Sequence, residues 1–388
     1  MSVPIARRLR PFGTTIFTEM SALALRTGAI NLGQGFPDTD GPAELTEAAA
    51  AALREGRNQY APLAGVPPLR AAIVAHQRRC YGLEIDPDDG VQVTFGATEA
   101  IASAMLGLLE PGDEAIALEP TYDSYGAAVA MAGGVLRPVT LRAPDFALDL
   151  DELRRVAASA RRARVLLLNS PHNPTGRVLT RAELEGIAAV CVEHDLVAVT
   201  DEVYEHLVFE GAKHIPLATL PGMAQRTLTI SSAGKSFSLT GWKIGWCSGP
   251  PELVAAARAA KQFLTFAGGT PLQHAVAHGL AEAERHTAPL TAQLQANRDR
   301  LASGLEAVGF AVSPTQGTYF VNADAAPLGV TDAASWCREL PQRIGLVAIP
   351  TSAFYADPAD GRTLVRFAFC KRPEVIEEAV GRLTRLAG

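Results

Sequence analysis

Lysine is rare in this chain, and two lysines lie close together in one segment. Five of the 35 Lys and Arg residues are lysines, and two of them are Lys235 and Lys243. Arginine stays protonated, whereas a partly buried lysine can lose its proton and attack a carbonyl carbon. The lysines kept here therefore indicate covalent chemistry on a carbonyl group. We expect Lys213, Lys261 and Lys371 to be ordinary surface residues.

A second candidate for chemistry is a carboxylate that follows a predicted strand. Asp201 directly follows the apolar run 197–200 and precedes Lys235. A charge at the end of a buried strand is desolvated unless a cation pairs with it. Asp201 therefore needs a cation from a ligand or from the protein. A helix N-cap or an internal salt bridge would explain this residue equally well.

A glycine turn follows the predicted strand 91–95 and opens a predicted helix. Gly96, Ala97 and Thr98 would present free backbone N–H groups and the positive end of the helix dipole. Both features suit a phosphate. The alternative is an ordinary strand-to-helix turn with Thr98 as its cap.

The segment 169–176 predicts a stiff loop after a third strand. Two X-Pro bonds and a glycine restrict its backbone and would hold the Asn173 amide in a fixed place over a ligand. The alternative is a loop stiffened for stability alone. No second His, Cys or carboxylate stands at ligand spacing from His172. We therefore expect His172 to be structural and predict no metal site.

Taken together, these features predict one particular cofactor. A lysine that can form an imine, a carboxylate for a protonated ring nitrogen and a turn that binds phosphate are what pyridoxal 5′-phosphate (PLP) requires. In Lys235, Asp201 and the turn 96–98 the chain has all three.

The elements that carry these residues alternate along the chain. Short, almost wholly apolar runs at 91–95, 114–118, 164–168 and 197–200 are separated by helical patterns, which is typical of a mostly parallel sheet covered by helices. After residue 250 the pattern changes to a smaller α/β unit, with a helix expected from Pro289. We expect three parts: an irregular N-terminal arm that belongs partly to the small domain (1–42), a large domain (43–284) and a small C-terminal domain (285–388).

Composition excludes several classes of protein. The 388 residues carry a net charge of −6 and are 48% hydrophobic, which is ordinary for a globular protein and argues against nucleic-acid binding. No run of 18 apolar residues predicts a membrane span. The five cysteines are odd in number and show no metal-ligand spacing, so we expect free thiols and a cytoplasmic protein.

Longer motifs around these residues resemble a known family. In order they are NLGQGFPD (31–38), NQY (58–60), FGATEA (95–100), EPTYDSY (119–125), NSPHNPTG (169–176), DEVYEH (201–206), SSAGKSFSLTGWKIGW (231–246) and VRFAFCK (365–371). Over essentially its whole length the chain resembles class I aminotransferases of PLP fold type I. Within that family it is similar to the branch with N-succinyldiaminopimelate aminotransferases and kynurenine and glutamine transaminases. The resemblance implies an α/β fold with a large and a small domain.

The resemblance also implies a role for each matching residue. Lys235 would form the Schiff base and move protons, Asp201 would pair with the ring nitrogen, and Tyr204 and Asn173 would bind the phenolic oxygen. The remaining cofactor contacts would be Tyr122 on the ring and, around the phosphate, Gly96, Ala97, Thr98, Ser232, Lys243 and Tyr60 of the neighbouring subunit in a homodimer. The substrate, an amino acid or a 2-oxo acid, would be bound by Arg366 at its α-carboxylate, together with Gly35, Asn173 and Phe17.

The substrate is the least determined part of this prediction. Phe17 stands where kynurenine-type relatives often carry tryptophan, and the segment 266–270 lacks their histidine. The short sequences AGGTP, GTYF and EMSALA resemble those of N-succinyldiaminopimelate aminotransferases. They favour N-succinyl-LL-2,6-diaminopimelate, an intermediate of lysine biosynthesis, as the amino donor, with 2-oxoglutarate as acceptor. The alternatives are a broad kynurenine, glutamine or methionine-type transaminase, an enzyme of a specialised pathway and a PLP-dependent carbon–sulfur β-lyase. A PLP-binding regulator would need a basic DNA-binding module, which is not present in this sequence.

Overall fold

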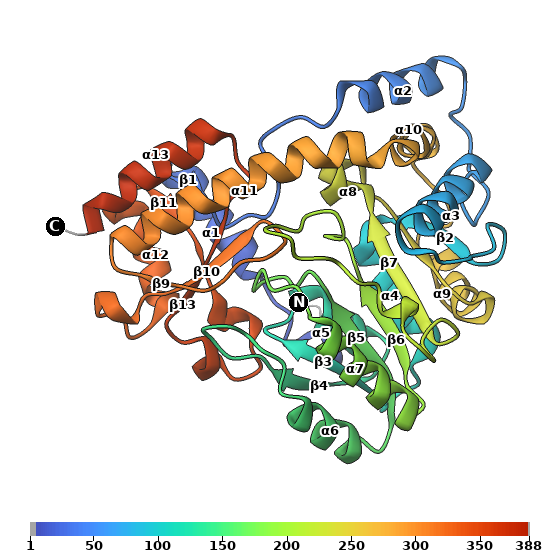
Figure 1. Ribbon diagram of the computed structural model, residues 1–388, viewed down its shortest axis with the longest axis horizontal. Helices are drawn as coiled ribbons and strands as arrows, with labels where there is room; N and C mark the ends of the chain where they lie inside the picture. Colours follow the sequence, from blue (N-terminus) through green and yellow to red (C-terminus); the bar gives the residue numbers. More distant parts are fainter. Residues whose placement is uncertain (1–4, 387–388) are drawn as a thin grey trace.

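A seven-stranded sheet forms the centre of the computed structural model, which describes residues 5–386 (Figure 1). Its strands lie in the order β2-β8-β7-β6-β5-β3-β4. Their bounds are β2 (Val91–Phe95), β3 (Glu114–Glu119), β4 (Val135–Thr140), β5 (Ala163–Asn169), β6 (Val197–Asp201), β7 (Thr227–Ser232) and β8 (Ile244–Ser248). Strand β8 is antiparallel to both β2 and β7, and the other pairs are parallel. The prediction of a mostly parallel sheet is confirmed.

Helices cover both faces of this sheet because alternate residues of each buried strand point to opposite sides. In β5, Leu166 and Leu168 pack in the core beneath α6 and α7, whereas Val165 and Leu167 pack beneath α4, α5 and α9. The helices of this part of the chain are α2 (Ala43–Arg54), α3 (Pro67–Tyr81), α4 (Gly96–Leu108), α5 (Asp123–Met131), α6 (Leu150–Ser159), α7 (Arg181–Glu193), α8 (Ala233–Ser236), α9 (Pro251–Leu264) and α10 (Thr270–Ala281). The near-continuous apolar strands are thus buried on both faces, as their sequence predicts.

A second, smaller unit contains the C-terminal strands and helices. Its four-stranded antiparallel sheet has the order β12-β13-β10-β9, and a separate parallel pair joins β1 to β11. The bounds are β1 (Ile30–Asn31), β9 (Ala311–Val312), β10 (Phe320–Asp324), β11 (Leu346–Val347), β12 (Ile349–Pro350), β13 (Leu364–Ala368), α11 (Ala283–Ala307), α12 (Ala333–Arg343) and α13 (Pro373–Leu383). The pairing of β1 with β11 brings the N-terminal segment to this unit.

The N-terminal segment is more regular than we expected. Helix α1 (Ile16–Thr27) begins after Thr15, whose side chain accepts a hydrogen bond from Thr18 N, and ends at Gly28 in the left-handed conformation. Met20 and Ala24 are buried in the core of the small unit. The prediction of an irregular arm was therefore wrong for residues 16–27, and residues 1–4 of that arm lie outside the described residues.

Helix α11 begins at Ala283, six residues before the start we expected. Pro289 lies in the second turn, where it removes one backbone hydrogen bond without ending the helix. In Figure 1 this helix, drawn in orange, runs from α10 to the C-terminal elements. The domain boundary at 284/285 remains a prediction, and it falls in the first turn of α11. Among residues 5–386, no helix is long and apolar enough to cross a membrane.

Candidate active site

The strand order brings the predicted chemical groups to one edge of the large sheet. Strands β2, β5, β6 and β7 all point the same way, so their carboxyl ends meet at that edge, where ligands bind in open α/β sheets. The register pairs Asn169 with Asp201, Ser232 with Gly245, and the final residue of β2 with the first residue of β8. Lys243 directly precedes β8 and reaches the same edge.

A cavity of about 250 Å³ opens at this edge and continues toward the small unit. All but one of the predicted site residues line it. They are Phe17, Gly35, Gly96, Ala97, Thr98, Tyr122, Asn173, Asp201, Tyr204, Ser232, Lys235, Lys243 and Arg366. Residues more than 300 positions apart in the sequence thus share one cavity.

Lys235 lies in the short helix α8, directly after β7. Its Nζ donates hydrogen bonds to the Tyr319 hydroxyl at 2.6 Å and to the Gly35 carbonyl oxygen at 3.4 Å. Burial lowers the pKa of Lys235 to about 8, because an ammonium group loses hydration there. At pH 7 roughly a tenth of the amine is therefore neutral, and this is the form that attacks a carbonyl.

Asp201 ends β6 in a fully buried position. The Tyr125 hydroxyl donates a hydrogen bond to its Oδ2 at 2.8 Å, and Val203 N approaches Oδ1 at 3.4 Å. Burial raises the pKa of Asp201 to about 6, although these hydrogen bonds act in the opposite direction. The carboxylate is thus a buried anion whose charge a cationic ligand would stabilise.

The N-terminus of α4 has the features of an anion-binding turn. Among the described residues no side chain caps this helix, so the Thr98 cap that we considered is not formed. Gly96 has a φ of +68°, and a Cβ built there would lie 3.2 Å from Lys243 Nζ. The Lys243 ammonium group therefore lies directly over the glycine turn, where positive charge and free N–H groups favour a phosphate.

Arg366 points into the protein and not to solvent, although it stands in an alternating strand. Its residue surface is 1% exposed, and its Nη1 and Nη2 donate hydrogen bonds of 3.0 Å each to Asn173 Oδ1 and to the Gly33 carbonyl. The guanidinium carbon lies 3.9 Å from the centre of the Phe320 ring and 5.1 Å from that of Phe17. Burial lowers the pKa of Arg366 to about 10, which still leaves it cationic at neutral pH.

The loop after β5 is held by its own polar side chains. Asn169 Nδ2 donates to the Asp201 carbonyl at 2.7 Å, and its Oδ1 accepts from Asn173 N at 2.7 Å. His172 Nδ1 pairs with Thr175 Oγ1 at 2.8 Å, and burial lowers the pKa of this histidine to about 3. His172 is therefore a neutral, buried loop residue, and the loop fixes Asn173 between Arg366 and the cavity.

Tyr60 is the one predicted site residue that does not line the cavity. It is 81% exposed and packs edge-on against Phe266, with ring centres 5.6 Å apart. Its assignment to the site of a neighbouring subunit remains a prediction.

Two lysines are buried where we expected surface residues. Lys261 is 2% and Lys371 is 7% exposed, and their ammonium groups donate hydrogen bonds to the carbonyl oxygens of Phe266 and Phe36. Their aliphatic stems are buried, and each ammonium group finds a backbone oxygen as the hydrogen-bond partner that a buried charge needs. Lys213 is exposed, as expected.

Sequence reasoning missed several residues of the site. Tyr125 binds Asp201, Tyr319 binds Lys235, and Asn169, Gln34 and Phe320 line the cavity. A signal existed for the first of them, because Tyr122 and Tyr125 are three residues apart and start the same helix, as neighbours on one face. The contact of Tyr319 with Lys235 crosses between the two units, and no local spacing predicts it.

The fold and the cavity define a family. Residues 27–383 match the family model of aminotransferases class I and II, and this chain belongs to that family. The family uses PLP and transfers an amino group between an amino acid and a 2-oxo acid, so this chain is an aminotransferase.

Particular relatives are similar over the whole chain. The chain is 54% identical to a probable N-succinyldiaminopimelate aminotransferase of Mycobacterium tuberculosis, with 98% of each chain covered. A solved structure of the N-succinyldiaminopimelate aminotransferase from Mycobacterium tuberculosis superimposes with a TM-score of 0.95 and covers 99% of this chain and 100% of that one. The methionine aminotransferase of Escherichia coli is 39% identical, with 98% and 97% covered. The predicted fold type is thereby confirmed.

Proposed function

We propose that this enzyme transfers the amino group of N-succinyl-LL-2,6-diaminopimelate to 2-oxoglutarate, with PLP as cofactor. The observation that carries the substrate is the 54% identity, over 98% of both chains, to a relative that bears this name. The observation that carries the chemistry is the cavity that joins Lys235, Asp201 and Arg366. The chain's free cysteines fit the expectation that it acts in the cytoplasm.

The cavity fits PLP group by group. Lys235 would bind the aldehyde carbon, and the buried carboxylate of Asp201 would pair with a protonated ring nitrogen. The α4 N-terminus, Ser232 and Lys243 would hold the phosphate, and Tyr122 would lie against the ring. Asp201 is the most specific of these features, since a fully buried carboxylate needs a cation.

In this proposal each residue has one physical task. The bound cofactor supplies an electron-withdrawing ring that makes the Cα–H of the substrate acidic. Lys235, with its lowered pKa, takes that proton and returns it at a neighbouring carbon. Asp201 keeps the ring nitrogen charged, Tyr204 and Asn173 bind the phenolic oxygen, and Arg366 orients the α-carboxylate.

Replacing Arg366 tests the carboxylate contact. We expect Arg366→Ala to lower kcat/KM by roughly 10²–10³-fold for an α-amino acid while the cofactor stays bound, because truncating one partner of a buried charge pair costs about 2–5 kcal/mol. Arg366→Lys should recover only part of this loss, since it keeps the charge but not the planar fork. Steady-state kinetics and the visible cofactor spectrum measure both effects.

The matched control for this substitution is Arg362→Ala, an exposed arginine just before the same strand. It should leave kcat/KM within about twofold, as surface substitutions usually do. Loss of cofactor from Arg366→Ala, with little change in KM for the remaining holoenzyme, would instead assign Arg366 a structural role.

A homodimer with shared sites is part of the proposal. Tyr60 is exposed on this chain and so is available to a second copy, as the family resemblance implies. Light scattering should give about twice the mass of one chain. The mass of one 40.9 kDa chain at working concentration would contradict the shared site.

A second candidate is a broad transaminase for methionine and similar side chains. The aromatic walls formed by Phe17 and Phe320 favour it, because they offer apolar surface to an uncharged side chain. The similarity to the methionine aminotransferase of Escherichia coli favours it as well.

A donor panel separates these candidates. Holoenzyme is assayed with 2-oxoglutarate and N-succinyl-LL-2,6-diaminopimelate, methionine, glutamine or kynurenine, by loss of the visible absorbance of the lysine-bound cofactor and by glutamate formed. We expect kcat/KM for the succinylated donor to exceed the others by at least about 10²-fold, a difference of about 2.7 kcal/mol. Equal values with methionine would favour the broad enzyme. Pyruvate released from cystathionine without any 2-oxo acid would favour a β-lyase.

A further inference from the structure

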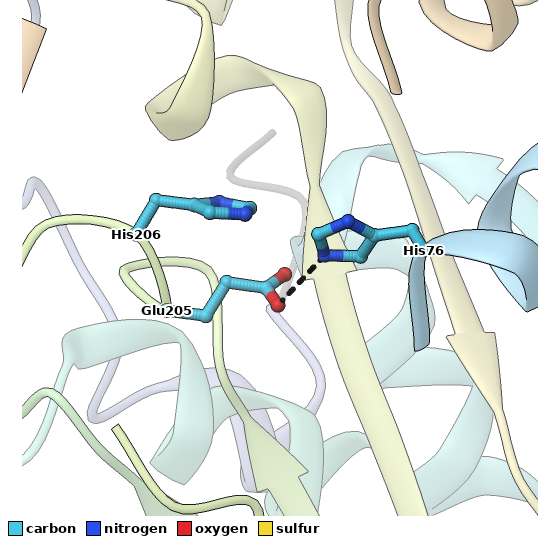
Figure 2. A group of neighbouring side chains, drawn as sticks. All are labelled: His76, Glu205 and His206. Carbon is cyan, nitrogen blue, oxygen red and sulfur yellow. Dashed lines mark hydrogen bonds and ion pairs between the residues drawn. The ribbon is translucent and has the colours of Figure 1, made fainter. Parts of the chain in front are cut away.

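A cluster of two histidines and a glutamate lies outside the proposed active site. His76 comes from the last turns of α3, and Glu205 and His206 follow β6 in the loop that also carries Tyr204. Figure 2 shows the two imidazole rings on either side of the Glu205 carboxylate. One ligand atom from each of the three residues lies within 4.8 Å of the other two, and His76 Nε2 lies 3.2 Å from Glu205 Oε2.

Further polar groups orient each member of this cluster. Ser231 Oγ donates to Glu205 Oε1 at 2.6 Å, and the Tyr81 hydroxyl donates to Oε2 at 2.7 Å. On the far side of each ring, His206 Nδ1 pairs with Ser236 Oγ at 2.8 Å, and His76 Nδ1 contacts the Cys80 sulfur at 3.5 Å. Metal-binding histidines almost always use their other ring nitrogen in this way, which fixes the tautomer and the ring orientation.

One ring nitrogen in the cluster is left over. His206 Nε2 is buried and has no hydrogen-bond partner among the residues that the structure describes. In the tautomer whose Nδ1–H donates to Ser236 Oγ, Nε2 carries the free lone pair of this ring. A buried polar atom without a partner costs free energy, and a metal ion would satisfy it.

The ligand types of the cluster suit a divalent cation. Two imidazoles, which bind metals in their neutral form, and one carboxylate converge on one position, and the Cys80 sulfur lies 3.5 Å from His76 Nδ1.

We propose that His76, Glu205 and His206 bind a divalent transition-metal ion, with Zn²⁺ as the preferred occupant. Two imidazole nitrogens and one carboxylate are a common Zn²⁺ ligand set, with water or a further ligand in the fourth position. Tetrahedral bonds of about 2.0–2.1 Å place ligand atoms roughly 3.3 Å apart. The pair His76–Glu205 already has this spacing, so only the half-buried His206 has to approach.

The ion would act on the structure and not on the reaction. It would tie the end of α3 to the loop after β6, which carries Tyr204 and directly follows Asp201. Through Ser231 and Ser236 it would also brace the segment that presents Lys235. The ion pair between His76 and Glu205, with a proton in place of the metal, is the competing arrangement.

The prediction that the chain has no metal site rested on the surroundings of His172 and on the spacing of the five cysteines. His76 and Glu205 are 129 positions apart, and only the fold brings the end of α3 beside the loop after β6. The adjacent pair Glu205 and His206 offers two ligands without the spacing of a metal motif.

Metal titration of the untagged holoenzyme tests the proposal. The enzyme is treated with a chelator, desalted and titrated with Co²⁺, followed by its d–d absorption at longer wavelengths than the cofactor bands, and with Zn²⁺, followed by calorimetry. We expect one ion per chain and a higher melting temperature with Zn²⁺. His206→Gln should weaken binding at least about tenfold and abolish the Zn²⁺-dependent rise in melting temperature. The matched control His278→Gln, an exposed histidine of α10, should bind as the wild type does.

Three results would overturn the proposal. They are no saturable binding by the wild type up to millimolar Co²⁺, equal affinity in His206→Gln, and a loss confined to Cys80→Ser, which would place the ion on the thiol. Because PLP itself can chelate metals, all variants are compared at equal cofactor content. If His206→Gln does not fold, zinc anomalous scattering from wild-type crystals decides, since a peak between the three side chains supports the site and its absence after soaking contradicts it.

Discussion

Lys235→Ala is expected to give a colourless and inactive protein. Removing this amine removes both the attachment point of the cofactor and the group that would move the Cα proton. General acid–base catalysis alone contributes roughly 10²–10⁴-fold, so we expect kcat to fall by at least about 10⁴-fold. The visible absorbance of the lysine-bound cofactor should disappear, and borohydride should no longer label the chain with the cofactor. Absorption spectra, mass spectrometry and single-turnover assays measure the three effects.

Two further substitutions make this test specific. Lys235→Arg keeps a cation but cannot form the covalent bond, so it should fail as Lys235→Ala does. Lys213→Ala removes an exposed lysine and should keep colour and activity. A yellow, active Lys235→Ala enzyme, or borohydride labelling at another residue, would overturn the assignment of Lys235 and the chemistry proposed from it.

The sheet and the residues at its edge could be predicted because their causes are local. A strand buried on both faces has to be almost wholly apolar, so a polar residue at its end, such as Asp201, marks the edge where a ligand binds. The scarcity of lysine made Lys235 and Lys243 conspicuous in the same way. In each case one segment carries both the signal and the function.

Contacts between distant segments could not be predicted in this way. The alternating pattern of its strand does not decide whether Arg366 faces solvent, and the structure places it between aromatic rings from three separate segments, including Phe17 and Phe320. The burial of Lys261 depends on where the chain passes after α9. Helix α1 was missed because its apolar residues find their core only when β1 pairs with β11. Tertiary packing determines these features, and it cannot be inferred from the composition of the chain or from the spacing of its residues.

Asp201→Asn is expected to lower kcat without lowering the stability of the folded chain. The amide cannot keep the ring nitrogen protonated, and an opposite charge in contact shifts such a pKa by about 1–3 units, so we expect kcat to fall by roughly 10²–10³-fold with cofactor still bound. Stability should not fall with it. Burial raises the pKa of Asp201 to about 6, so the folded chain holds this proton more tightly than the unfolded chain does.

The sign of the pH effect follows from that difference. Between pH about 4 and 6 the folded state binds more protons, so the wild-type protein without cofactor loses stability as the pH rises, by about 3 kcal/mol in all. Asparagine resembles the protonated acid. At pH 8 the cofactor-free Asp201→Asn protein should therefore be at least as stable as the wild type in urea, and the difference should shrink at pH 5.

The matched control for this substitution is an aspartate that lies just before the start of the same strand. Asp195→Asn changes an aspartate whose side chain is 95% exposed at the opposite end of β6, and whose ion pair with Arg226 should contribute little. It should alter neither turnover nor the pH dependence of unfolding. Near-normal kcat in Asp201→Asn would remove this carboxylate from the mechanism. A variant that is less stable than the wild type at pH 8 would show instead that the protein itself, through groups such as Tyr125, already stabilises the charge that we assign to the cofactor.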